Sequence, residues 1–163
     1  MMIRMFTTLV ATTALVTLSS LAQAQSAPPQ YGANVSHEMA RKAMAGAVAN
    51  AKSQNLPMAI AIVDTAGLLI AFERMDNTQS GSVAVSQDNA ASAALYRRPT
   101  KVFQDVLAAG GAGLRVLTLR GANAVEGGVP IVVDGKIVGA IGVSGGSAEQ
   151  DGVVAKAGLD AMK

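Results

Sequence analysis

Apolar residues recur at three- and four-residue spacing in several segments of the chain, and this spacing predicts helices. Ser36 is placed to cap the first helix, and Ser147 with Gln150 three residues later has the spacing of a capping box before the last. Pro99 ends the second helix, which is rich in Ala and Ser and therefore suited to close packing on a sheet. The expected helices cover residues 36–54, 82–96, 102–107 and 147–162.

Continuous apolar runs of strand length lie between these helices, and turn sequences separate two pairs of them. One turn is Asp64-Thr65-Ala66-Gly67, and the other is Asp134-Gly135, a strong signal for a tight hairpin. Tight turns join antiparallel strands, so an all-parallel sheet is excluded. We expect an α+β protein in layers, an antiparallel sheet covered by helices, with Pro130 marking an edge strand. The expected strands cover residues 58–63, 68–74, 114–119, 129–133 and 137–143.

The first residues have the three-part pattern of a secretory signal sequence. Met1–Arg4 is a short basic start, Phe6–Leu21 is apolar, and Ala22-Gln23-Ala24 is a small-x-small cleavage site. The apolar run is short for a membrane span of about 20 residues, so we expect cleavage after Ala24 and no stable membrane anchor. Export points to a periplasmic or secreted protein. We divide the chain into a signal peptide (1–24), a disordered lead-in (25–35) and one domain (36–163).

Composition excludes several classes of site. The chain has no Cys, one His and no Trp among its 163 residues, so thiol catalysis, iron–sulfur clusters and multi-histidine metal sites are excluded. Half of the residues are hydrophobic and the net charge is +2, which suits a globular domain and gives no basic surface for nucleic acid.

One glycine-rich segment matches a catalytic motif. Gly142-Val143-Ser144-Gly145-Gly146 fits G-x-S-x-G between a strand and a helix, as in the nucleophile elbow of hydrolases, but no His follows Ser144 to serve as its base. Two interpretations of Gly145 and Gly146 remain. They are either a structural strand exit, or their N–H groups bind an anion at the helix start.

Several linked blocks of the sequence resemble the GlcG/HbpS-like family across nearly all of residues 36–163. The blocks are Ile62–Gly67, Arg74–Asp76, Arg98–Thr100, Gly127–Ile131, Asp134–Gly146 and Gln150-Asp151. The resemblance implies a five-stranded antiparallel sheet of profilin-like type flanked by helices. It also implies homo-oligomers and, in some members, haem or corrinoid binding. Haem degradation has been attached to the family name, and other members accompany glycolate or diol utilisation.

Candidate ligand-binding residues come from both lines of reasoning. The resemblance implies that Thr100 borders a haem site and is a candidate iron ligand, with His37 as the alternative. Tyr96 is a further candidate axial ligand, and Arg98 is either a helix-terminal charge or a partner for an anionic group. Phe103 lies near the small residues 90–94, which either leave an apolar slot between subunits or pack helix on helix. Gly145 and Gly146 complete the set.

Our leading hypothesis is an exported, oligomeric haem-binding protein for sequestration, transport or sensing. Two alternatives remain. One is an accessory small-molecule-binding protein, and the other is an enzyme that degrades haem or acts in glycolate or alcohol utilisation.

Overall fold

The structure, a computed structural model, describes residues 27–163, so the predicted signal peptide lies outside the described residues. Within this range no helix is long and apolar enough to cross a membrane. The elements are α1 (His37–Ser53), β1 (Ala59–Val63), β2 (Leu69–Arg74), α2 (Gly81–Tyr96), α3 (Thr100–Ala108), the 3₁₀ helix η1 (Gly111–Thr118), β3 (Gly128–Val133), β4 (Lys136–Ser144) and α4 (Ala148–Asp160).

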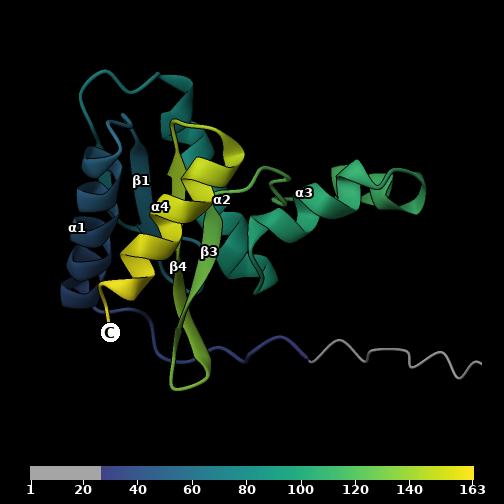
Figure 1. The fold of residues 1–163 in the computed structure, drawn as a ribbon. Helices are drawn as coiled ribbons and strands as arrows, with labels where there is room; N and C mark the ends of the chain where they lie inside the picture. Colours follow the sequence, from purple (N-terminus) through teal and green to yellow (C-terminus); the bar gives the residue numbers. More distant parts are fainter. Residues whose placement is uncertain (1–26) are drawn as a thin grey trace, which may run out of the picture.

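The sheet contains four strands in the order β2-β1-β4-β3, and each neighbouring pair is antiparallel. The α+β class and the two hairpins are thus confirmed, and β3 with its Pro130 is an edge strand as predicted. The expected five strands are wrong by one. Residues 114–119 belong to η1 and its end, where the chain projects away from the sheet and has no neighbouring strand to pair with (Figure 1).

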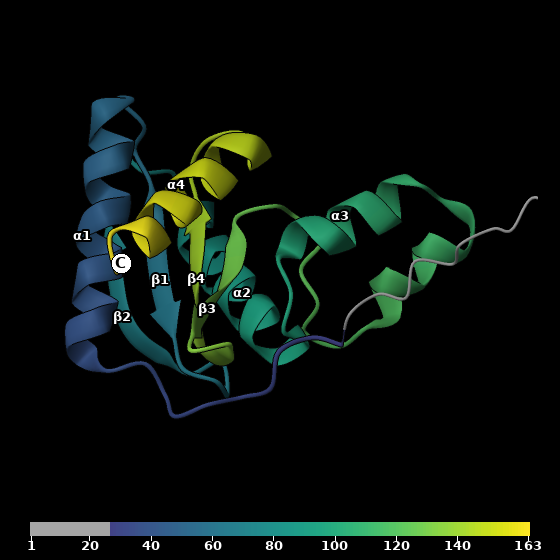
Figure 2. The same cartoon turned by 60° about the horizontal axis from the view of Figure 1, so that its bottom comes forward.

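Three helices cover the two faces of the sheet. The helices α1 and α4 lie on one face and α2 on the other, as Figures 1 and 2 show from two directions. The Ser36 hydroxyl accepts a hydrogen bond from the Met39 N–H, and Ser147 and Gln150 form the predicted capping box. The core on the α1 and α4 side joins alanines of α1 to the isoleucines Ile60, Ile62 and Ile141.

The helix α2 lies unusually close to β4 because both carry small residues where they meet. A Cβ built on Gly142 would overlap the Ser86 carbonyl and the Ala90 N–H, and would lie 2.8 Å from the Ala90 Cβ. This close approach lets the Asn89 side-chain amide donate to the Val143 carbonyl at 3.0 Å. The Ala- and Ser-rich composition of this helix therefore serves packing, as the sequence indicates.

The helices α3 and η1 form an arm that projects from the body of the molecule (Figures 1 and 2). They pack mainly on each other. Gly110 and Gly111, both at positive φ, turn the chain between them. The arm leaves the body after Tyr96 and returns before Gly128.

The segment before α1 is partly ordered, in contrast to the expected disordered lead-in. From Gln30 to Val35 the chain hydrogen-bonds to the start of β4, and Val35 is buried in the core. Disorder was expected because of Pro28, Pro29 and Gly32. The segment is ordered because Val35 packs in the core and Tyr31 hydrogen-bonds to the end of α2.

Candidate functional site

Four of the predicted site residues meet where α2 joins α3, a region that we call the joint (Tyr96, Arg98, Thr100 and Phe103). Arg97 adopts a left-handed conformation with φ 54° and reverses the chain, and Pro99 then starts α3. The Tyr96 and Phe103 rings pack edge to face with their centroids 5.1 Å apart. Because α2 ends and α3 begins at this one tight turn, residues two to seven positions apart lie close together.

The Arg98 side chain is held in place at the joint. Its Nε donates to the Tyr96 carbonyl at 3.1 Å, and its guanidinium carbon lies 5.8 Å from the centroid of the Phe103 ring. Arg98 is exposed. A guanidinium that is oriented in this way and open to solvent is suited to bind a carboxylate, because less side-chain freedom is lost on binding.

Thr100 is fully buried, and its hydroxyl has a role in the fold. Its Oγ1 accepts a hydrogen bond from the Gly128 N–H at 2.9 Å, which ties the start of α3 to the start of β3. The hydroxyl points into the protein, so this arrangement does not fit an iron ligand.

His37, the alternative ligand, lies apart from the joint. It is exposed in the first turn of α1, in a shallow hollow that it lines with Glu38, Arg41, Lys42 and Ala45. The helix α1 covers the sheet face away from α2, whereas the joint is at the root of the arm (Figure 1). The structure thus does not bring His37 together with the other candidates.

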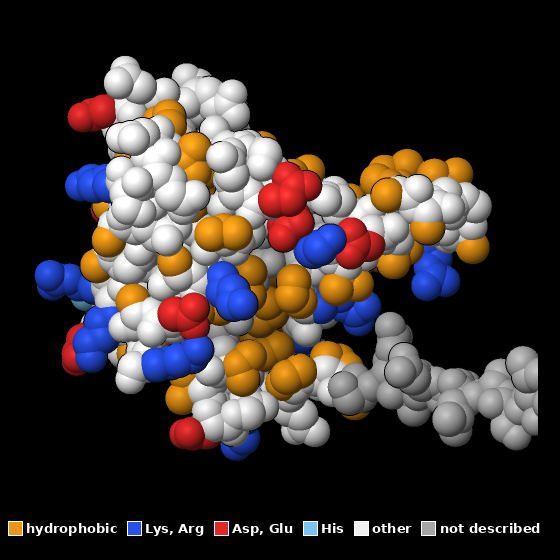
Figure 3. Space-filling model, viewed as in Figure 1, with side chains coloured by type: hydrophobic (Ala, Val, Ile, Leu, Met, Phe, Trp, Pro, Cys, Tyr) orange, Lys and Arg blue, Asp and Glu red, His pale blue; other side chains and the backbone are white. Residues whose placement is uncertain are grey.

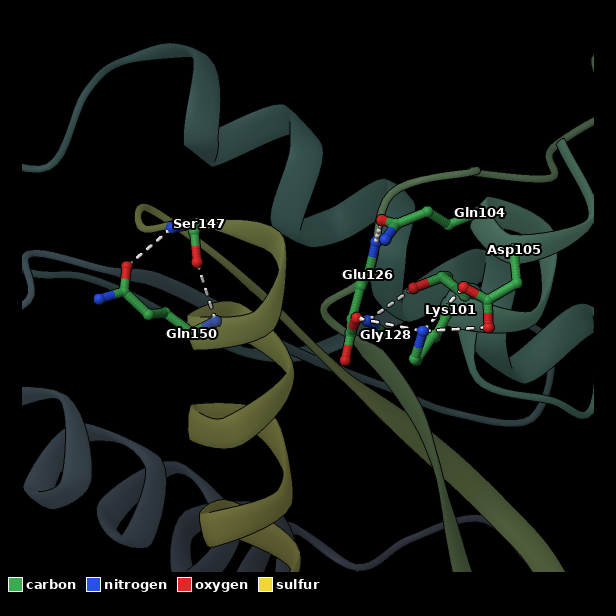
Figure 4. Close-up of polar contacts among 8 residues, drawn as sticks. Lys101, Gln104, Asp105, Glu126, Gly128, Ser147 and Gln150 are labelled. Carbon is green, nitrogen blue, oxygen red and sulfur yellow. Dashed lines mark hydrogen bonds and ion pairs between the residues drawn. The ribbon is translucent and has the colours of Figure 1, made fainter. Parts of the chain in front are cut away.

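Gly145 and Gly146 also lie apart from the joint, and an internal group occupies the expected anion position. The Gly146 N–H donates to the Asp151 carboxylate at 2.9 Å. The Ser147 N–H donates to the Gln150 side chain at 2.8 Å, as Figure 4 shows. Gly145 has φ 155°, and a side chain there would overlap the Pro57 carbonyl. The structural interpretation of these glycines therefore fits the structure better than anion binding.

Asp151 is a buried carboxyl group that the sequence analysis did not single out. It is 3% exposed, and burial raises its pKa to about 6, while the Gly146 and Gly145 N–H groups favour the charged form and the nearby Glu126 opposes it. The side chain completes the turn from β4 into α4, so its function is local structure.

Ser144 is not arranged as a hydrolase nucleophile. Its hydroxyl is buried and donates to the Ser82 hydroxyl at 3.1 Å, across the contact between β4 and α2. The G-x-S-x-G match thus reflects close packing.

The site residues predicted from the sequence also leave out a polar network at the root of the arm (Figure 4). Lys101 pairs with Asp105 at 2.7 Å and lies 4.0 Å from Glu126, while the Gln104 side chain accepts from the Glu126 N–H at 2.8 Å. The hydrogen bond with Asp105 raises the pKa of Lys101. The four-residue spacing of Lys101 and Asp105 was the available signal. Within residues 27–163, no three His, Asp or Glu side chains form a metal-binding group.

The arm beside the joint carries exposed apolar side chains. Leu117 is 71% exposed and Leu114 54% exposed, with Val102 and Leu119 also at the surface. Figure 3 shows hydrophobic side chains over much of the arm. Exposed apolar side chains gathered in one place are typical of contact surfaces and of ligand-binding grooves.

Comparisons with known proteins agree with this fold. The family model described as "Haem degrading protein HbpS-like" matches residues 35–160. Protein GlcG of Escherichia coli strain K12 is 40% identical over 110 residues, which cover 68% of this chain and 81% of GlcG. The structure of protein ORFY of Klebsiella pneumoniae has a TM-score of 0.74 and 26% identity, and covers 85% of this chain and 97% of ORFY. A PduOC:haem complex has a TM-score of 0.71 and 26% identity, and covers 78% of this chain and 94% of PduOC. The chain belongs to the HbpS-like family.

Proposed function

We propose that this protein is an exported haem-binding protein that works as a homo-oligomer in haem sequestration, transport or sensing. Family membership and the haem complex of PduOC support haem as the ligand. The comparisons give no support to a corrinoid, so the proposal is restricted to haem. The signal-like residues 1–24 support export.

The observation that carries the proposal is the fixed Arg98 guanidinium at the base of an apolar arm. Haem combines an apolar ring with two carboxylates, so its site needs an apolar surface next to a cation. Arg98 would hold a propionate, and the exposed Val102 and Leu114 of the arm are candidates to contact the ring. Bound haem would supply the redox chemistry of its iron, while the chain itself binds and orients the ring.

Haemin titration of the mature protein tests this proposal. We expect a saturable Soret shift at fixed stoichiometry. In Arg98→Ala we expect a loss of affinity of at least about tenfold, because a charge-assisted hydrogen bond contributes about 1.5–3 kcal/mol. Arg41→Ala, on the distant α1, is the matched control and should leave the affinity unchanged.

Two results would contradict the proposal. The first is a parent protein that shows no saturable Soret shift, and the second is an Arg98→Ala variant that binds haemin as the parent does. Loss of binding in His37→Ala alone would move the site to α1. Addition of a reductant to the complex separates haem binding from haem degradation. Breakdown of the haem ring by the parent protein would support the enzyme alternative.

The arm supports the oligomer in this proposal. We expect light scattering to give the parent a multiple of the monomer mass, and Leu117→Glu to lower that mass, because a charge on a buried interface residue is costly. Leu68→Glu is the control, since Leu68 is 65% exposed in the β1–β2 turn, away from the arm. A monomeric parent at micromolar concentration would refute the oligomer, and an unchanged mass in Leu117→Glu would refute the role of the arm.

A further inference from the structure

The segment before α1 forms a strap, residues 29–35, across the end of the sheet. Figure 2 shows it running from α1 towards the root of the arm. The Ile137 N–H donates to the Gln30 carbonyl, and the Gly32 N–H donates to the Ile137 carbonyl, both at 2.8 Å. The Val35 N–H donates to the Val138 carbonyl at 2.7 Å. The strap is therefore attached to the first residues of β4 as a short parallel strand would be.

Tyr31 connects the strap to the last turn of α2. Its hydroxyl lies 2.9 Å from the Ala94 carbonyl and 3.1 Å from the Leu95 carbonyl, and donates to this pair. The Arg97 guanidinium lies 5.5 Å from the centroid of the Tyr31 ring and donates to the Pro29 carbonyl at 3.4 Å. The strap thus contacts both the carbonyl groups and the side chain at the end of α2.

The turn that Tyr31 contacts determines where Arg98 points. Arg97 holds the left-handed backbone conformation at φ 54°, which residues other than Gly adopt only at a cost in free energy. The backbone hydrogen bonds that close the turn are long, since the Arg97 and Arg98 N–H groups each lie 3.3 Å from their acceptors, Ala94 and Ala93. They are the two bonds of a Schellman motif, which closes many helices, and here both are long. The strap adds contacts from outside the helix to this turn, through Tyr31 and Arg97.

We propose that Tyr31 is a positioning residue: the strap clamps the left-handed turn at Arg97 and thereby fixes Arg98 for a ligand carboxylate at the joint. Arg97 is engaged by the strap, so Arg98 is the arginine of the pair that is presented to solvent. The ligand part of this inference rests on the proposed function, whereas the clamp is a property of the protein without ligand.

Hydrogen exchange tests the clamp without haem. In Tyr31→Ala we expect the Arg97 and Arg98 amides to exchange at least about tenfold faster than in the parent, because the turn opens locally. Tyr31→Phe keeps the ring and loses the hydroxyl, so its rates should lie between the two. Thr65→Ala is the matched control. It removes the 2.6 Å hydrogen bond to Asn34 at the other end of the strap and should leave both amides unchanged.

Haemin titration then tests the positioning role. We expect affinity to fall in the order parent, Tyr31→Phe, Tyr31→Ala, and the effect of Tyr31→Ala to disappear in an Arg98→Ala background, because Tyr31 acts through Arg98. A merely structural role would leave the two effects additive.

The outcomes separate the two proposals. Unchanged exchange at Arg97 and Arg98 in Tyr31→Ala overturns the clamp, whatever haemin does. Faster exchange with unchanged haemin affinity, or with additive effects, overturns the positioning role. A parent that binds no haemin overturns the proposed function, and the exchange rates still decide the clamp.

Discussion

Gly142→Ala should lower the Tm by about 10 °C, although it adds only one methyl group. The new Cβ would overlap the Ser86 carbonyl and the Ala90 N–H of α2, both backbone groups, so the whole helix has to move. Overpacking of this kind costs typically 1–3 kcal/mol, and we expect about 3 here because the shift also strains the bond between Asn89 and Val143. Replacing Gly in a strand recovers only about 0.5–1 kcal/mol of chain entropy, so the clash dominates. For a domain of this size, 1 kcal/mol corresponds to roughly 3–5 °C.

Gly81→Ala is the control for this experiment. Gly81 begins α2 with no atom within 4 Å of an added Cβ and without a positive φ, so its Tm should stay the same or rise slightly. Thermal melting of the two variants beside the parent measures both effects. A Gly142→Ala protein that melts with the parent would show that α2 can move away from β4 at little cost.

Asp151→Asn should remove a pH dependence of stability between about pH 4 and pH 6. Burial raises the folded-state pKa from 3.8 to about 6, so over this range Asp151 binds more protons in the folded protein than in the unfolded chain. Ionisation of Asp151 therefore lowers the free energy of unfolding as the pH rises, by at most about 3 kcal/mol. Asn stays neutral and its Oδ1 can still accept from the Gly146 N–H, so the variant lacks this decline.

The measurement is the free energy of unfolding by urea from pH 4 to pH 8, and the slope against pH is compared, so any constant loss in the variant does not matter. Glu149→Gln provides a control of opposite sign. The pKa of the exposed Glu149 is lowered, first by its own backbone N–H and then by Ser147, so its charge stabilises the protein above the unfolded pKa and is lost in acid. Parallel curves for the parent and Asp151→Asn would show that Asp151 ionises at its ordinary pKa.

Local signals in the sequence were sufficient for most of the fold. Asp134 and Gly135 both take positive φ, as the tight hairpin requires, and Ser147 and Gln150 cap α4. Residues 114–119 were misassigned because a short run with Leu or Val at positions 114, 116, 117 and 119 is compatible with either a strand or a 3₁₀ helix. Only the tertiary position, on an arm without neighbouring strands, distinguishes them.

The site was harder to predict than the fold, because several of its contacts leave no signal in the local sequence pattern. Tyr96, Arg98 and Phe103 come together through one local turn, so proximity in the sequence was informative. Asp151 meets Gly146 within a single turn, yet nothing in the sequence showed that its carboxylate would take the position proposed for an external anion. Tyr31 is more than sixty residues from Ala94, and no local pattern links a lone aromatic residue to a distant helix end.

The arm begins and ends at almost the same place, because the Thr100 hydroxyl at its start bonds the Gly128 N–H where the chain returns to the sheet. The two ends of the arm are held together by this hydrogen bond, whereas α3 and η1 pack mainly on each other. Insertions and deletions at the tip, around Gly110 and Gly111, therefore leave the register of the strands intact. The arm can therefore change in length without disturbing the sheet, and its length sets how far it extends from the body.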